Sequence, residues 1–235
     1  MARKAPSPGT RSSNNRVLSI PSSFYNALGL NAHSHLQLLY YLLCMETRRL
    51  LDAAAALSQL LRANSVPHAF YGSVLTAVLA NNSQSDEIFC VVEGGQNQPH
   101  AFRRVRDALA GNPDFTITHS PWTNRLHVTY RRFIPAIEIE ILPAGEHGPR
   151  HLDQTTVMKL QGLPFLTISE FLRSKLRAWM GRGEDRDAQD IVYVLGRHWN
   201  RVDINRIPEA DMNFFVARHA SVGPAWAAVR RKYGI

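Results

Sequence analysis

Paired carboxylates on one predicted strand are the residues whose type and spacing most directly suggest chemistry. Glu138 and Glu140 alternate with three isoleucines, Ile137, Ile139 and Ile141. Because successive side chains of a strand point to opposite faces, the isoleucines should face a core and both glutamates the other side. Two carboxylates on one face are suitable oxygen ligands for Mg²⁺. Taken alone, the pattern favours the plainer interpretation, a half-exposed strand with an acidic solvent face.

A second acidic pair stands just before an apolar run. Asp86 and Glu87 lead into residues 88–92, whose β-branched and aromatic side chains predict a buried strand. Along that segment Glu87 and Phe89 would share one face, and Asp86 would point to the other.

A glycine turn separates a short strand from a helix at Tyr71-Gly72-Ser73. Glycine lets the backbone approach a ligand closely, and a helix start presents free N–H groups and a positive dipole end to a phosphate. Ser73 would add a hydroxyl donor. Since a glycine before a helix is more often only a turn, the segment predicts a phosphate site only with other support.

Hydrophobic periodicity places these residues on alternating helices and strands. It predicts one long helix or two successive helices over 34–61, and further helices over 74–80, 101–110, 168–180, 187–199, 211–219 and 224–232. It predicts strands over 67–71, 88–92, 115–119, 126–130 and 134–142. This order predicts an α/β (α+β) fold, a mixed β-sheet flanked by helices with a helical C-terminal part. We expect a disordered basic tail over 1–16, a domain over 17–199, and a helical extension over 200–235 packed on that domain.

Taken in order, these pieces resemble the nucleotidyltransferase superfamily, particularly its small fungal and toxin-like members. In that family a Gly-Ser turn precedes a short helix, an Asp-hydrophobic-Asp stretch enters a strand, and a third Asp lies on a later strand. The turn corresponds directly to Gly72 and Ser73. The strand's closing valines put Glu87 at the first Asp and Phe89 at the second. Glu140 falls at the third, because residues 140–145 look like the family's Asp-Ile-Leu-x-Pro-Gly.

A lysine and an aspartate pair extend the resemblance downstream, so that it covers roughly residues 51–195. Phe-Leu-Arg-Ser-Lys175 resembles the family's helix that bears a lysine, and Asp187-Ala-Gln-Asp190 resembles its Asp-x-x-Asp element. Lys175 is accordingly expected to contact a phosphate, although it could simply extend from an amphipathic helix. Asp187 and Asp190 are expected to make surface ion pairs with neighbouring arginines.

The resemblance implies transfer of a nucleoside monophosphate from an NTP to a hydroxyl of a protein, an RNA or a small molecule. It assigns catalytic Mg²⁺ binding to Glu87 and Glu140, and nucleotide binding to Gly72, Ser73 and Lys175. Asp86, beside Glu87, is a further candidate metal ligand, and Glu138, on the strand face of Glu140, is a further candidate catalytic carboxylate. Two departures matter. Longer glutamates replace aspartates, and Phe89 supplies no oxygen where the family bridges both ions, although Mg²⁺ tolerates little change in ligand geometry.

Two alternatives to an enzyme therefore stay open. One is a catalytically degenerate nucleotidyltransferase fold that binds a nucleotide, an RNA or a protein partner. The other is an interaction module whose acidic strand face has no ligand.

The composition of the whole chain limits the kind of protein this can be but does not identify a binding partner. The formal net charge of +8 fits a polyanionic partner but is as common in proteins that it merely keeps soluble. Cys44 and Cys90 do not stand at metal-ligand or redox spacing. No stretch is apolar enough to span a bilayer, so we expect an intracellular protein, cytoplasmic or nuclear. A mitochondrial transit peptide is the alternative, since no acidic residue precedes Glu46. The sequence indicates no oligomeric state.

Overall fold

A computed structural model describes residues 32–80, 88–94, 100–119, 125–146 and 148–235. The chain divides into two compact units, residues 1–40 and 41–235. Of the first unit only the opening turns of helix α2 (Ala32–Ala63) are described. The second unit holds the described strands and also residues 200–235. The predicted tail over 1–16 and the acidic pair Asp86 and Glu87 lie outside the described residues.

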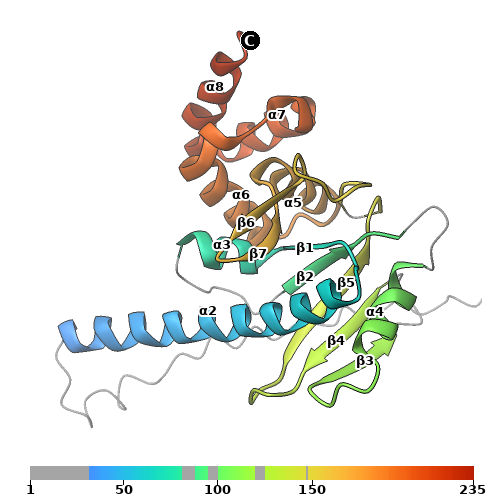
Figure 1. Ribbon diagram of the computed structural model, residues 1–235. Coiled ribbons are helices and arrows are strands. Elements are labelled where there is room, and N and C mark those ends of the chain that lie inside the picture. The colour runs from blue at the N-terminus through green and yellow to red at the C-terminus, as the bar shows by residue number, and fades with distance from the viewer. Residues whose placement is uncertain (1–31, 81–87, 95–99, 120–124, 147) are drawn as a thin grey trace, which may run out of the picture. The chain divides into compact units, whose positions relative to one another are not determined.

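The described strands form one mixed sheet, which confirms the predicted fold class (Figure 1). They are β1 (His68–Tyr71), β2 (Ile88–Val92), β3 (Phe115–His119), β4 (Leu126–Tyr130), β5 (Ile137–Pro143), β6 (Val157–Leu160) and β7 (Leu163–Leu166). Their order is β3-β4-β5-β2-β1-β7-β6. β2 pairs in parallel with β5, and β1 with β7, whereas the other neighbours are antiparallel.

Helices precede, connect and follow these strands, and those after β7 form the expected helical C-terminal part. They are α3 (Ser73–Ala80), α4 (Ala101–Leu109), α5 (Ile168–Arg182), α6 (Asp185–His198), α7 (Glu209–Arg218) and α8 (Gly223–Lys232), with 3₁₀ turns η1 (Trp199–Arg201), η2 (Ile204–Arg206) and η3 (Ala220–Val222). The predicted segment 34–61 is one continuous helix, α2.

β6 and β7 form a hairpin that the sequence pattern does not predict. Each strand has four residues, and β7 contains Pro164, so neither carries a clear periodic signal. Gln161 and Gly162 join them with φ angles of 50° and 79°. Positive φ at both central residues is the mark of a tight hairpin turn. The hairpin extends the sheet beside β1 and leads directly into α5.

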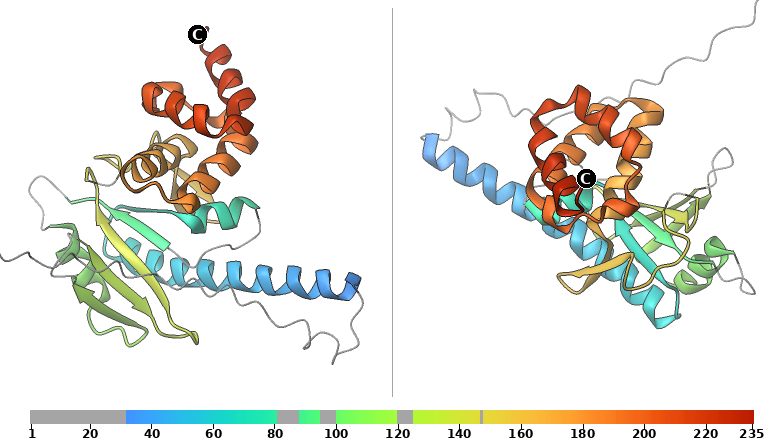
Figure 2. Two further views of the ribbon diagram at one scale, coloured as in Figure 1. Left: turned by 180° about the vertical axis from the view of Figure 1, so that it is seen from behind. Right: turned by 90° about the horizontal axis from the view of Figure 1, so that it is seen from above.

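Strand alternation gives the two faces of the sheet different surroundings. Ile137, Ile139 and Ile141 are buried while Glu138 is exposed and Glu140 half-buried, as the sequence predicts. The apolar face packs against α4 and the C-terminal part of α2 (Figure 2). The opposite face carries the glutamates, and at β1 it borders a cavity that α5 also lines.

Among the described helices, none combines the length and the apolar character that crossing a bilayer requires.

Candidate functional site

Four side chains line up across the face of the sheet that carries the glutamates. In the strand register Tyr71 pairs with Phe89, Phe89 with Glu140, and Glu140 with His127. Paired residues on adjacent strands point to the same face, so these side chains are lateral neighbours. Burial raises the pKa of the Tyr71 hydroxyl, and the negative charge of Glu140 adds to the rise. Tyr71 therefore stays a neutral hydroxyl at ordinary pH.

The ring of Phe89 closes the space beside the Gly72-Ser73 turn. Gly72 has a φ of 88°, which glycine adopts without strain. A Cβ atom on Gly72 would stand 2.4 Å from Cδ2 of Phe89, so the ring lies directly against the turn. Its centroid is 5.2 Å from that of the Tyr71 ring. Where the resemblance expects a metal-bridging carboxylate, an aromatic ring packs on the backbone.

Ser73 begins α3, but its hydroxyl is directed into the protein. The residue is buried, and its Oγ donates to Oδ2 of Asp190 over 3.4 Å. Thr76, one turn further, donates from Oγ1 to Oδ1 of Asp190 over 2.9 Å. Neither Gly72 nor Ser73 lines the large cavity beside α5 or the smaller cavity along β5. The hydroxyl predicted to contact a phosphate is thus engaged by a carboxylate instead.

Lys175 lies in a buried cluster of charges that joins α5 to α6. Its Nζ is 2.9 Å from Oδ1 of Asp187 and 2.7 Å from Oδ2 of Asp190, and its side chain is 3% exposed. Arg182 donates to the other oxygen of Asp187 over 2.8 Å. Although burial acts to raise the pKa of Asp187, the hydrogen bond from Arg182 and the charge of Lys175 hold it below its ordinary value.

These contacts correct the prediction of surface ion pairs at Asp187 and Asp190. The side chain of Asp187 is 1% exposed, and that of Asp190 is 12% exposed. Helical spacing alone does not reveal this burial, because the face of α6 that carries them meets α5 and α3 only in the folded chain.

Of the predicted metal ligands only Glu140 is described, and it has another partner. Glu140 forms an ion pair with Arg125, 2.6 Å from Oε1 to Nη1. Glu138 is exposed on the same strand face. Asp86 and Glu87 lie outside the described residues. Within the part of the chain that is described, no three His, Cys, Asp or Glu side chains are grouped so that they could hold a metal ion.

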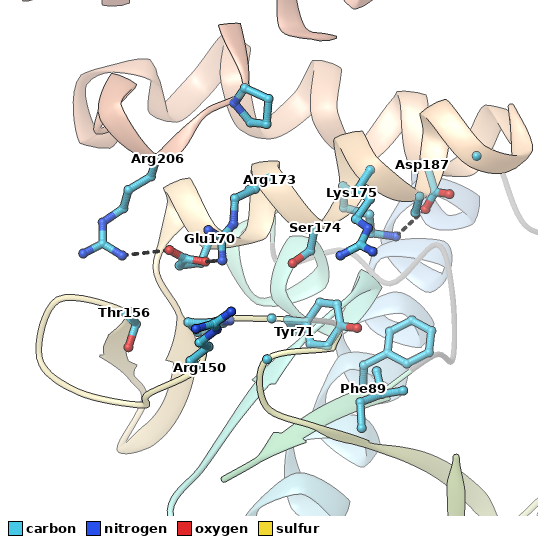
Figure 3. Close-up of a pocket in the computed structure, with 18 of the residues that line it drawn as sticks. Tyr71, Phe89, Arg150, Thr156, Glu170, Arg173, Ser174, Lys175, Asp187 and Arg206 are labelled. Carbon is cyan, nitrogen blue, oxygen red and sulfur yellow. Dashed lines mark hydrogen bonds and ion pairs between the residues drawn. The ribbon is translucent and has the colours of Figure 1, made fainter. Parts of the chain in front are cut away.

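A cavity of about 1040 Å³ opens between the sheet, the β5–β6 connection and the first C-terminal helices (Figure 3). Tyr71 and Phe89 form one end, and α5 forms a long wall. The start of α7 and the preceding turn η2 contribute Arg206, Pro208 and Asp211. The basic side chains along it are Arg125, Arg150, Arg173, Lys175, Arg177, Arg182 and Arg206, and the acidic ones are Asp153, Glu170, Asp187 and Asp211.

A smaller cavity of about 400 Å³ lies along the acidic strand. Glu138, Glu140 and His127 line it together with Glu46 and Arg49 of α2. The latter two are themselves paired, with Nη1 of Arg49 2.7 Å from Oε2 of Glu46. The two predicted carboxylates Glu138 and Glu140 therefore share a cavity, but one that Lys175 does not line.

Sequence reasoning missed the arginines and Glu170 that line the larger cavity. Arg150 stands on an irregular connection, Arg173 on a helix and Arg206 in a 3₁₀ turn, so no single periodicity relates them. The positive net charge is the only signal that pointed to them.

Comparison with known proteins identifies the architecture. No family model matches this sequence, and no curated protein matches it. The antigenic nucleotidyltransferase-like protein from Paracoccidioides brasiliensis has a similar structure, with a TM-score of 0.55 and 15% identity, over 75% of this chain and 91% of that chain. Weaker similarities are to JHP933 from Helicobacter pylori (TM-score 0.46, 14% identity, 79% of each chain) and to the antibiotic-resistance factor ANT(2'')-Ia (TM-score 0.47, 8% identity, 77% of this chain and 96% of that chain).

Proposed function

We propose that this chain, which has the nucleotidyltransferase fold, binds a phosphate-bearing ligand of nucleotide size in its basic cavity and does not transfer a nucleotidyl group. This is the degenerate, ligand-binding alternative among the functions that the sequence leaves open. The proposal concerns the cavity and its residues, because a shared fold does not by itself fix a function.

The packing of the Phe89 ring against Gly72 supports the loss of metal-dependent transfer. Two Mg²⁺ ions in a transferase need a carboxylate that bridges them. The described residues do not fit such ions, since Phe89 offers no oxygen and Glu140 already neutralises Arg125. A metal at Glu140 would have to displace a guanidinium group that contacts the carboxylate at 2.6 Å.

The charge of the cavity supports a phosphate-bearing ligand. Seven of the described lining side chains are Lys or Arg and four are Asp or Glu, so the lining is positive overall. Six of the seven cations are arginines, whose planar fork of N–H donors matches the oxygens of a phosphate group. Charges inside a cleft also focus the field on a ligand of opposite sign.

The size and the aromatic end of the cavity fit a nucleotide. A volume of about 1040 Å³ is slightly above the range typical for sites that bind small molecules, so the cavity has room for a nucleotide. Tyr71 and Phe89 offer aromatic surface at one end, on which a base can stack. Arg173 of α5 and Arg150 of the β5–β6 connection lie further along the same cavity (Figure 3).

Titration calorimetry on the full chain tests the proposal. ATP, GTP and AMP are titrated in EDTA and again in excess Mg²⁺, and release of pyrophosphate from ATP and GTP is measured in parallel. We expect binding that does not require Mg²⁺, and no pyrophosphate above the background of the buffer. Adenosine, which has no phosphate, should bind much more weakly than AMP.

Two matched variants locate the site. Arg150→Ala removes a cavity arginine and should weaken binding roughly tenfold, the size expected for losing a hydrogen bond to a charged group. Arg103→Ala removes an exposed arginine of α4 and should change nothing. Absence of binding by all three nucleotides would refute the proposal. Mg²⁺-dependent pyrophosphate release would instead establish the transferase that the resemblance implies.

A further inference from the structure

A buried carboxylate lines the basic cavity and contacts two arginines from different elements. Glu170 stands in the first turn of α5, and its side chain is 1% exposed. Nη1 of Arg206 donates to its Oε1 over 2.8 Å, and Nη2 of Arg173 lies 2.6 Å from its Oε2 as an ion pair. Figure 3 shows both guanidinium groups on either side of the carboxylate.

Two further contacts fix the orientation of Arg206. Its Nη2 donates to Oγ1 of Thr155 over 2.9 Å, and its Nε lies 3.5 Å from Oδ2 of Asp203, so the guanidinium plane is held at three points. The hydrogen bond from Arg206 to Glu170, together with the carboxylate's charge, raises the pKa of Arg206 further above its already high value. This arginine therefore stays charged and is held in one orientation.

We infer that Glu170 is a positioning residue that holds Arg173 and Arg206 as a two-armed clamp for a phosphate group carrying two negative charges. The inference rests on the proposed function and names the part of the cavity that would hold the ligand's phosphate. Glu170 itself repels an anion, and its role is to orient the two groups that attract one.

The charge of the cavity as a whole, rather than of this cluster, favours a bound anion over a closed structural cluster. Glu170 and Asp203, whose Oδ2 lies 3.5 Å from Nε of Arg206, together balance the charges of Arg173 and Arg206, so the surplus positive charge comes from the other arginines that line the cavity. The side chains of Arg173 and Arg206 remain 38% and 29% exposed. Each terminal nitrogen of a guanidinium carries two N–H donors, so N–H groups that these contacts do not use can reach a ligand. Arg150, across the cavity on the β5–β6 connection, adds another cation nearby (Figure 3).

A doubly charged phosphate matches this arrangement better than a carboxylate. A terminal phosphate presents three oxygens and close to two negative charges, so two arginines can each bind it through paired N–H donors. A single carboxylate would leave one arm without a charged partner. AMP and inorganic pyrophosphate both present such a terminal group and serve as probes.

Charge and position make opposite predictions for Glu170→Gln. The substitution removes a negative charge from the cavity, so electrostatic attraction alone predicts tighter binding of AMP and pyrophosphate. If Glu170 orients the clamp, binding of both probes should become about tenfold weaker, even though the cavity has lost a negative charge. If Glu170 only stabilises the fold, the substitution should lower the melting temperature but should not weaken the binding of AMP and pyrophosphate.

Arg206→Lys provides a second variant that keeps the charge and leaves Glu170 in place. A lysine cannot reproduce the fork that contacts Glu170 and Thr155 together, so it too should bind the probes about tenfold more weakly. Arg103→Ala is the matched control, and thermal unfolding is followed for every variant.

The outcomes separate the clamp from the proposed function. If the wild-type chain binds the probes and both Glu170→Gln and Arg206→Lys bind them equally well or more tightly, the clamp is refuted and the cavity proposal survives. If the wild-type chain binds neither probe, the cavity proposal is refuted and the clamp falls with it. Should Glu170→Gln fail to fold, the result for Arg206→Lys decides alone.

Discussion

Phe89 lies directly opposite Glu140 on the neighbouring parallel strand, and its ring reaches across to the backbone of Gly72. An apolar ring therefore stands between the glycine turn and the only described carboxylate of β5 that is half-buried. Arg125 holds that carboxylate from the other side. A position that the resemblance assigns to metal binding has thus become a position of side-chain packing.

Gly72→Ala should destabilise the chain by about 2 to 4 kcal/mol, because a left-handed φ and a collision with Phe89 act together. Gly111→Ala is the matched control: its φ is 75°, but a Cβ there would meet nothing within 4 Å. It should cost only about 1 to 2 kcal/mol. Urea unfolding of both variants measures the difference. Equal losses would mean that the ring does not press on the turn.

Phe89→Asp should create weak Mg²⁺ binding, since it puts a carboxylate beside Glu140 on the same sheet face. Phe89 is half-buried and borders both cavities, so the variant should fold and lose less than the about 3 to 5 kcal/mol of a fully buried Phe. Adding Glu140→Gln should abolish the gain. Calorimetric Mg²⁺ titration checks this, with Phe89→Asn as the control. A folded Phe89→Asp chain that binds no Mg²⁺ would show that this position cannot be returned to metal binding.

The sheet was largely predictable because its signal is local. Ile137, Ile139 and Ile141 alternate with glutamates along β5. This period of two identifies the buried side of the strand from the local sequence alone. The β6–β7 hairpin escaped prediction because four residues with a proline at the second position of β7 show no alternation. Its turn at Gln161 and Gly162 depends on positive φ, which composition suggests only weakly.

The site was less predictable because its contacts join residues far apart in the chain. Ser73 and Asp190 are 117 positions apart, yet their hydrogen bond decides that the serine does not face a ligand. Glu170 and Arg206 are 36 positions apart and meet only because η2 packs against α5. Motif spacing identified Lys175, but it could not show that two aspartates surround its ammonium group.

Lys175→Met should destabilise the chain by about 3 to 5 kcal/mol, because it leaves Asp187 without its buried cationic partner and removes one from Asp190. Lys159→Met, at an exposed position of β6, is the matched control and should be nearly neutral. Urea unfolding measures both variants, and AMP titration follows. If Lys175→Met is as stable as the wild type but binds AMP poorly, Lys175 contacts a phosphate, as the resemblance implies. The prediction that Lys175 stabilises the fold by pairing with the two aspartates would then be wrong.

His68 should make the chain less stable as the pH falls below 6.5. Its ring is buried between α2 and β1: Nδ1 lies 2.8 Å from the carbonyl of Val66, and Nε2 lies 2.8 Å from Oγ of Ser58. A carbonyl can only accept, so Nδ1 carries the proton and Nε2 accepts from Ser58 in the neutral ring. Ser58 in turn accepts from Nε of Arg62 over 3.1 Å. A second ring proton would face a hydroxyl that already donates toward it, beside a guanidinium group.

Burial lowers the pKa of His68 below its ordinary value of 6.5, and the charge of Arg62 lowers it further against the opposing effect of the Val66 carbonyl. Above pH 6.5 both the folded and the unfolded ring are neutral, so His68 imposes no pH dependence there. Below pH 6.5 the unfolded chain binds the proton first, and stability falls by up to about 1.4 kcal/mol per pH unit until the folded pKa is reached. Urea unfolding at a series of pH values should show this fall in the wild type and a smaller one in His68→Gln. His198→Gln must be measured beside it, because burial also lowers the pKa of His198. If His68→Gln keeps the full slope and His198→Gln loses it, the pH dependence belongs to the C-terminal helices instead.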